Sequence, residues 1–185
     1  MKLKHIALVA ALMLGGILTA TPINAADNVD KAAMRQAGGQ VAEQDKKFAL
    51  EAGKIGMAEV AAGKQAAEKG TAPVKEFGQH MVQDHGMANK KLMQIAEDKG
   101  IQLPQQVDKK HQKIMDKMAD MSGANFDKEY LDAQVKDHKK AIKVFEKQAE
   151  DGRDPALKQF AAETLPTLQE HLKMAQDLRK KMAKA

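Results

Sequence analysis

The stretch FDKEYLDAQVKDHKKAIKVF, residues 126–145, decides the fold. It contains no Pro or Gly, and residues that favour a helix fill it. At about 100° per residue, one side of this helix carries the aromatics Tyr130 and Phe145 and should face a core, yet five of the seven residues on that side are polar or charged. The seven are Asp127, Tyr130, Gln134, Asp137, His138, Ala141 and Phe145. Because buried polar groups need partners and buried carboxylates must be paired or bind a metal, what these side chains bind is the central functional question.

The N-terminus has the features of a targeting segment. Lys2 and Lys4 precede an apolar run at residues 6–18, and residues 23–25 form a plausible cleavage site. The run is shorter than the roughly 20 residues that a membrane span needs, so it predicts a signal peptide. The predicted organisation is a signal peptide at 1–25, a flexible leader at 26–44 and a helical bundle at 45–185. We expect the mature chain to have no transmembrane segment and to reside in the periplasm, with secretion as the alternative.

Composition limits the partners and the core. Without Lys2 and Lys4 the chain carries 28 basic and 25 acidic residues, a net charge of +3 spread over helix surfaces. A basic face interleaved with aromatics is missing, so no nucleic-acid partner is expected. Aromatic residues make up only 3% of the chain, which predicts a core of Ala, Leu, Val, Ile and Met, as in a helical bundle. The composition indicates no particular protein partner and is compatible with a homo-oligomer.

Apolar residues recur with helical spacing in four long segments. These segments are 45–69, 73–99, 125–151 and 155–180, and a shorter helix is expected at 105–121. Pro166 predicts a kink in the last helix. We therefore predict an all-α fold, a four-helix bundle in which the short helix lies in one long crossover, so that segments 73–99 and 125–151 run parallel.

In this arrangement four polar residues fall at one depth. Glu59, His85, His138 and His171 each lie about 13 or 14 residues from the same end of the bundle, or roughly 20 Å along it. One Glu and three His on one layer suit a single transition-metal ion such as zinc, copper or iron. The residues expected to surround these four ligands are Asp84, Asp127, Tyr130, Gln134 and Asp137.

An Asp-His pair occurs twice, as Asp84-His85 and Asp137-His138. The two members of a pair point about 100° apart on a helix, so they cannot bind each other. Crosswise pairing, Asp84 with His138 and Asp137 with His85, is one arrangement that satisfies them. A metal-free hydrogen-bond network of this kind is the alternative to a metal site. No nucleophile with a base, phosphate loop or cofactor motif is present, so no catalytic residues are predicted and a non-enzyme is favoured.

The chain resembles a family of exported bacterial proteins, domain of unknown function forty-one forty-two, over about residues 45–180. The motifs that carry the resemblance are AEV at 58–60, VKEF at 74–77, MVQDH at 81–85, KGIQLP at 99–104, FDKEY at 126–130, QVKDH at 134–138 and LPTLQEHL at 165–172. The resemblance implies a ferritin-like bundle and export, without an established reaction. Di-iron ferritin-like proteins place a Glu three residues before a His, whereas Val82, Val135 and Leu168 occupy those positions here, which disfavours ferroxidase chemistry.

Two functions therefore compete. One is a periplasmic protein that binds a transition metal through the core His and carboxylate cluster, for metal handling or stress tolerance. The other is a non-catalytic structural or stress-protection module, in which the buried polar layer only specifies packing.

Overall fold

The computed structural model describes residues 41–184, and all regular structure in this range is helical. The helices are α2 (Glu43–Lys69), α3 (Ala72–Asp98), α4 (Lys109–Met118), α5 (Gly123–Asp151) and α6 (Pro155–Met182). The all-α prediction is thereby confirmed for the described part of the chain. The predicted signal peptide and most of the predicted leader fall on residues 1–40, outside the described residues.

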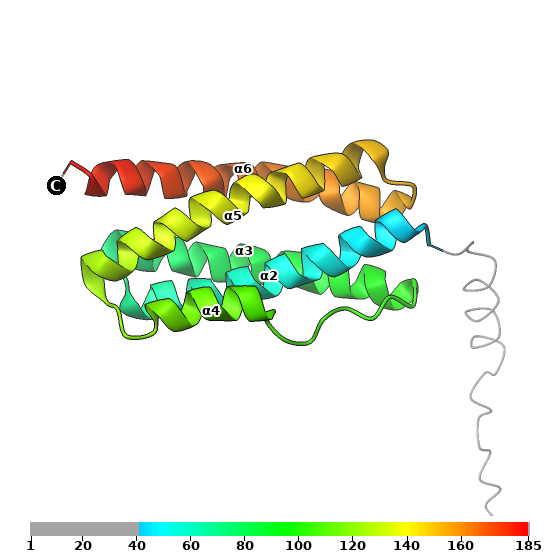
Figure 1. Cartoon of the computed structure of the whole chain (residues 1–185). Coiled ribbons are helices and arrows are strands. Elements are labelled where there is room, and N and C mark those ends of the chain that lie inside the picture. Colours follow the sequence, from blue (N-terminus) through cyan, green and yellow to red (C-terminus); the bar gives the residue numbers. More distant parts are fainter. Residues whose placement is uncertain (1–40, 185) are drawn as a thin grey trace, which may run out of the picture. The chain divides into compact units, whose positions relative to one another are not determined.

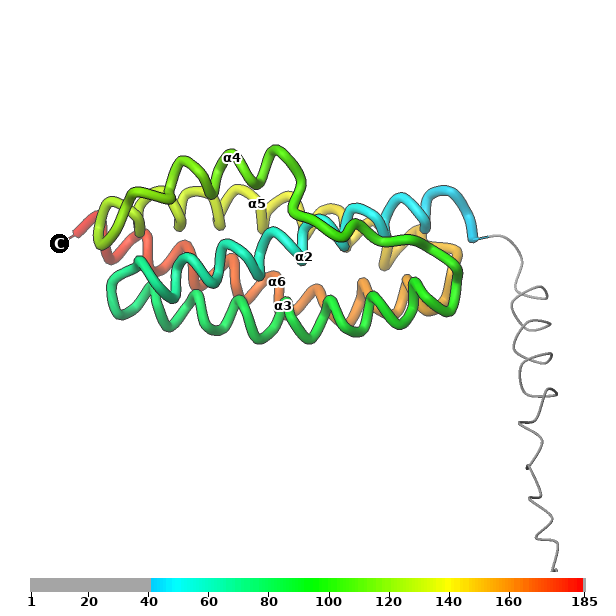
Figure 2. Tube along the Cα trace, turned by 90° about the horizontal axis from the view of Figure 1, so that it is seen from below, coloured from blue at the N-terminus to red at the C-terminus, as the bar shows by residue number. Residues whose placement is uncertain are grey.

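The four long helices form two antiparallel hairpins, α2 with α3 and α5 with α6 (Figure 1). The hairpins pack together through α2 against α5 and α3 against α6. The segment between α3 and α5 runs back along the bundle and contains α4, which packs against α2 and α5 (Figure 2). Because of this crossover α3 and α5 run in the same direction, as the sequence predicts, and the connectivity is that of bundles with one long crossover.

Local sequence explains where the helices end. Gly100, at a φ of 66°, ends α3, with Gly100 N–H donating to the carbonyl of Glu97 (3.1 Å) and Ile101 N–H to that of Ala96 (2.8 Å). Asp108 caps α4 by accepting from two backbone N–H groups, so this helix begins at Lys109 rather than at residue 105. The last helix, α6, continues through Pro166 to Met182.

Two glycines let α2 and α3 approach closely. A Cβ atom on Gly63 would lie 2.9 Å from the carbonyl oxygen of Gly78, and one on Gly78 would lie 2.7 Å from that of Gly63. Both distances are shorter than real Cβ contacts, and backbone cannot move aside as a side chain can. The first hairpin therefore depends on glycine at both positions.

The core consists of two apolar clusters, one in each half of the bundle. The Phe145 cluster contains Phe48, Ala49, Ala52, Leu92, Ala96, Ile101, Ala141, Phe145, Leu157, Phe160, Ala161 and Leu168. The Tyr130 cluster contains Ala66, Val74, Phe77, Met81, Met118, Phe126, Tyr130, Leu131, Val135 and Ala175. In every long helix one buried polar residue separates the two clusters along the sequence: Glu59, His85, His138 or His171. A polar layer thus crosses the middle of the bundle.

Buried carboxylates fix the two ends. Asp127 accepts from the N–H (3.0 Å) and the hydroxyl (2.5 Å) of Thr71, which joins the start of α5 to the α2–α3 turn. Asp45 accepts from the side chain of Gln148 and from the N–H groups of Arg153 and Asp154. Asp127 stands 11 residues before His138, or roughly 16 Å along the helix, so it binds the turn rather than the polar layer.

We expect Asp127→Ala to lower the free energy of unfolding by about 1–3 kcal/mol, because two donors of Thr71 lose their buried acceptor. Urea denaturation measures this loss. The control is Asp120→Ala, since Asp120 is exposed, and its stability should stay within about 0.5 kcal/mol of the wild type. Equal effects of the two substitutions would contradict a role for Asp127 in joining the turn to α5.

Candidate metal centre

Three histidines from three helices meet in the polar layer. His85 comes from α3, His138 from α5 and His171 from α6, and their ring centroids lie 5.2 to 5.6 Å apart. One ring nitrogen of each lies within 4.8 Å of the other two. The three side chains are at most 5% exposed. Such a group of imidazoles, brought together from distant parts of the sequence, has the composition of a metal site.

Hydrogen bonds orient two of the rings. His138 lies with Nδ1 at 3.1 Å from the carbonyl oxygen of Gln134, one turn earlier in α5. His171 lies with Nε2 at 2.9 Å from Oδ2 of Asp84 on α3. A carbonyl and a carboxylate only accept, so each of these nitrogens carries the proton. Metal-binding histidines typically donate their second ring N–H to such an acceptor, which fixes both the tautomer and the ring orientation.

The nitrogens that remain have no partner among the described residues. They are Nε2 of His85, Nε2 of His138 and Nδ1 of His171, all buried. In neutral rings, His138 and His171 can offer only a lone pair here, since their protons are on the opposite nitrogens. His85 has one N–H and satisfies one of these lone pairs at most. A hydrogen-bond network of these three rings is therefore incomplete, whereas one cation accepts all three lone pairs.

The spacing of the nitrogens fits a metal after a small closure. Zinc binds imidazole nitrogen at about 2.0–2.1 Å, so three ligands of a tetrahedral ion lie roughly 3.4 Å apart. For one nitrogen of each ring, the observed separations are up to 4.8 Å. Ring rotations that move each nitrogen by roughly 1 Å are enough to close this difference.

Burial keeps the imidazoles neutral. It lowers the pKa of His138 from 6.5 to about 4, and it lowers the pKa of His85 well below 6.5. The pKa of His171 is also lowered by burial, although the bond to Asp84 opposes this shift. Neutral imidazole is the form that binds metals, so all three rings are ready for a cation at neutral pH.

Glu59 lies beside the histidines and outside their group. Its Oε2 accepts from Nε2 of Gln134 at 2.8 Å, and its Oε1 lies 3.7 Å from Nδ1 of His138, the nitrogen that donates to the Gln134 carbonyl. Burial raises the pKa of Glu59 to about 7, and His138 is neutral there, so this contact is not an ion pair. The structure thus groups three of the four predicted ligands and places Glu59 against the ring of one of them.

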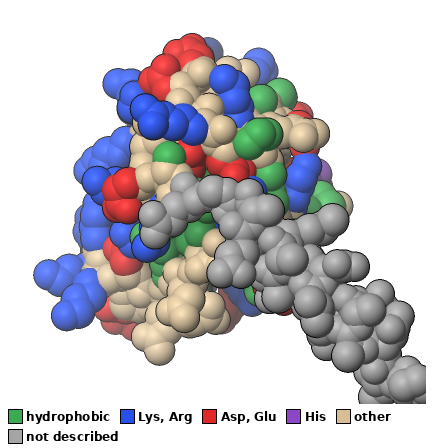
Figure 3. All heavy atoms as spheres, turned by 90° about the vertical axis from the view of Figure 1, so that its right-hand side faces the viewer, with side chains coloured by type: hydrophobic (Ala, Val, Ile, Leu, Met, Phe, Trp, Pro, Cys, Tyr) green, Lys and Arg blue, Asp and Glu red, His purple; other side chains and the backbone are tan. Residues whose placement is uncertain are grey.

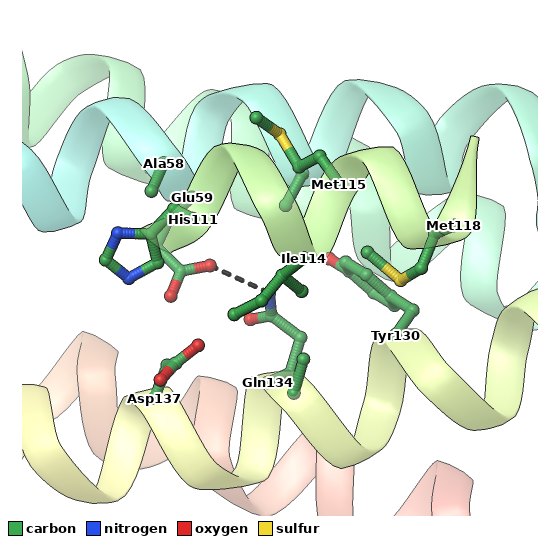
Figure 4. A pocket seen from close by; sticks show the side chains of 11 residues that line it. Ala58, Glu59, His111, Ile114, Met115, Met118, Tyr130, Gln134 and Asp137 are labelled. Carbon is green, nitrogen blue, oxygen red and sulfur yellow. Dashed lines mark hydrogen bonds between the residues drawn. The ribbon is translucent and has the colours of Figure 1, made fainter. Parts of the chain in front are cut away.

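A small cavity adjoins Glu59 on the side covered by α4 (Figure 4). Its volume of about 20 Å³ has room for one water molecule. Tyr130 and Gln134 line it, and the Tyr130 hydroxyl and Gln134 Oε1 are buried with no partner among the described residues. Asp137 and His111 also line this cavity. None of the three clustered histidines does.

The crosswise pairing expected from the repeated Asp-His motif is wrong. Asp84 binds His171 instead of His138, and Asp137 lines the cavity beside Glu59 instead of meeting His85. The reason is the packing of α3 against α6, which puts the residue before His85 next to the last helix. Sequence reasoning also missed the carbonyl of Gln134 as a partner of His138. The four-residue spacing between Gln134 and His138 is the only feature of the sequence that could have indicated this hydrogen bond.

The surface carries both acidic and basic side chains. On the end of the bundle shown in Figure 3, acidic and basic side chains are interspersed among polar and apolar ones. Within residues 41–184, no helix is both long and apolar enough to span a membrane.

Fold and site together define a four-helix-bundle protein with one crossover and a buried three-histidine group that can hold a metal. The chain belongs to the family described as Domain of unknown function (DUF4142), which matches residues 30–178. No curated protein and no solved structure matches it, so its likeness to ferritin-like proteins rests on connectivity.

The raised pKa of Glu59 predicts a pH-dependent effect of Glu59→Gln in metal-free protein. A carboxyl whose pKa rises from 4.5 to about 7 on folding stabilises the native state at low pH, and this contribution is lost as pH rises through 7. The stability of Glu59→Gln relative to wild type should therefore increase from pH 5 to pH 8, by up to about 3 kcal/mol.

Urea denaturation at both pH values measures this difference. The control is Glu97→Gln, because Glu97 is exposed and its substitution should change stability equally at both pH values. A pH-independent effect of Glu59→Gln would show that Glu59 ionises normally in the core.

Proposed function

We propose that this protein binds a single transition-metal ion in the middle of its bundle, through His85, His138 and His171, and serves metal handling or stress tolerance. The observation that carries the proposal is the convergence of three buried, unpartnered imidazole nitrogens. The acceptors on the opposite nitrogens of His138 and His171 support it, since they hold the lone pairs toward the common centre.

The donor set favours zinc, copper or iron. Imidazole nitrogen suits these metals, while magnesium and calcium prefer oxygen ligands. Three protein ligands leave at least one position of a four-coordinate ion for water or another small ligand. The paired carboxylates of di-iron proteins are missing from the motif positions, so we propose one ion rather than two.

The alternative function is a structural module whose polar layer has no metal. The bonds of Gln134 to Glu59 and of His138 to the Gln134 carbonyl support it, because both form without an ion. The unpartnered nitrogens of the three rings favour the metal site over this structural module. A metal-free network of the three rings leaves at least one buried lone pair unsatisfied.

We place this function in the periplasm, after export. The basic start, the apolar run at residues 6–18 and the small-residue site at 23–25 support export. A periplasmic location is compatible with the lack of cysteine, since neither disulfides nor thiolate ligands are needed for a histidine site.

Metal binding should raise the melting temperature of chelator-stripped protein near neutral pH. Binding to the native state alone adds about 2.7 kcal/mol at a hundredfold excess over the Kd. His138→Ala should abolish the rise with zinc, copper and iron, whereas His80→Ala should retain it, because His80 is exposed. Unchanged melting of the wild type with every metal would overturn the proposal and favour the structural module.

The bond between Asp84 and His171 gives a second test. Asp84→Ala should weaken metal affinity by about 10–100-fold, because His171 loses the acceptor that fixes its ring and its tautomer. Isothermal titration with zinc measures the change. The control is Asp177→Ala, because Asp177 lies on α6, as His171 does, but binds a surface lysine, so the affinity should stay unchanged. An unchanged affinity in Asp84→Ala would show that the Asp84–His171 pair does not support the site.

A further inference from the structure

A groove between α3 and α6 reaches the histidine cluster from outside. Its volume is about 230 Å³, and its walls include Asp84 and His85 on α3 and Thr164 and Thr167 on α6. Of the three clustered histidines only His85 lines it, and no part of the cavity under α4 reaches any of the three rings. The groove therefore gives the cluster an open side, at the ring of His85.

His85 differs from the other two rings in how it is held. The buried Nε2 of His85 has no hydrogen-bond partner among residues 41–184, whereas His138 and His171 each donate to an acceptor. It is nevertheless 95% buried, with its ring against those of both other histidines. Because Nε2 has no such bond, rotation of this ring toward the groove breaks no hydrogen bond of that nitrogen.

The charges along the groove suit a cation. Asp84 is 29% exposed and supplies a carboxylate next to both His85 and His171. Glu163 on α6 binds Lys91 on α3, so an ion pair spans the mouth from one helix to the other. Both of these side chains are about half exposed, and exposed ion pairs contribute little to stability, so the pair opens easily.

From these observations we propose that the metal ion reaches the site through the α3–α6 groove, and that His85 is the ligand it meets first. Asp84 draws the cation inward and then remains as the acceptor for His171, while His138, on the far side, completes the site. The small cavity under α4 is lined by Glu59 and Gln134 and by none of the three histidines, so it offers the ion no such route. This inference rests on the proposed metal binding and adds the route by which the ion arrives.

The test is the rate of zinc binding to chelator-stripped protein, followed by stopped flow with a chromophoric chelator as competitor. Thr167→Phe puts a ring into the groove and should slow binding by about tenfold or more, while the equilibrium affinity stays within about twofold of the wild type. The matched control is Ala133→Phe, which puts the same ring beside the cavity under α4 and should leave the rate unchanged.

A second variant keeps the test informative if Thr167→Phe does not fold. Lys91→Ala removes a positive charge and the ion pair at the mouth, so zinc should bind about two- to tenfold faster. Because salt screens charges, this increase in rate should be smaller at high salt. Unaltered rates in both groove variants, or slower binding in Ala133→Phe alone, would overturn the groove as the route. Failure of the wild type to bind zinc, copper or iron at equilibrium would instead refute the proposed function itself.

Discussion

The structure depends on one constraint, that three imidazoles, each with a buried ring nitrogen that has no partner among the described residues, come together in one layer. His138 and His171 are committed to this arrangement because their protons point outward, to the carbonyl of Gln134 and to Asp84. His85 can satisfy only one of the two lone pairs that it meets. Unsatisfied buried polar groups cost free energy. The layer is therefore unfavourable by itself, and the cation that we propose would remove the cost.

The same layer specifies how the helices align. One buried polar residue from each long helix lies between the Phe145 cluster and the Tyr130 cluster. A shift of one helix by a single turn, about 5.4 Å, would move an imidazole or a carboxyl into one of these apolar clusters, where it has no partner. Asp45 and Asp127 reinforce the alignment at the two ends by binding the loops there. Polar groups thus determine the register, and apolar burial supplies the driving force.

Sequence alone could predict the four helices, the crossover and the common depth of the polar residues. Helical spacing of apolar residues and a rise of 1.5 Å per residue carry that much information. The partners of each polar group could not be predicted, because they depend on helix rotation and rotamers. Glu59 is at the expected depth but turns to Gln134, and Asp84 binds His171 because α3 packs against α6. Asp127 lies on the expected face of α5, but it binds Thr71 at the end of the bundle, beside the Tyr130 cluster and away from the polar layer.

The three histidines of the candidate metal centre come from both hairpins of the bundle. His85 belongs to the α2–α3 hairpin, while His138 and His171 belong to the α5–α6 hairpin. The two hairpins are joined by the long crossover, by packing across their interface and by hydrogen bonds such as those of Asp45 and Asp127 at the two ends. The proposed metal ion, held by all three rings, would link them at mid-height, far from the loops that Asp45 and Asp127 fix. Because its three ligands come together only when the hairpins are docked, its binding free energy would add to the stability of that interface, and metal binding and docking of the hairpins would be linked equilibria.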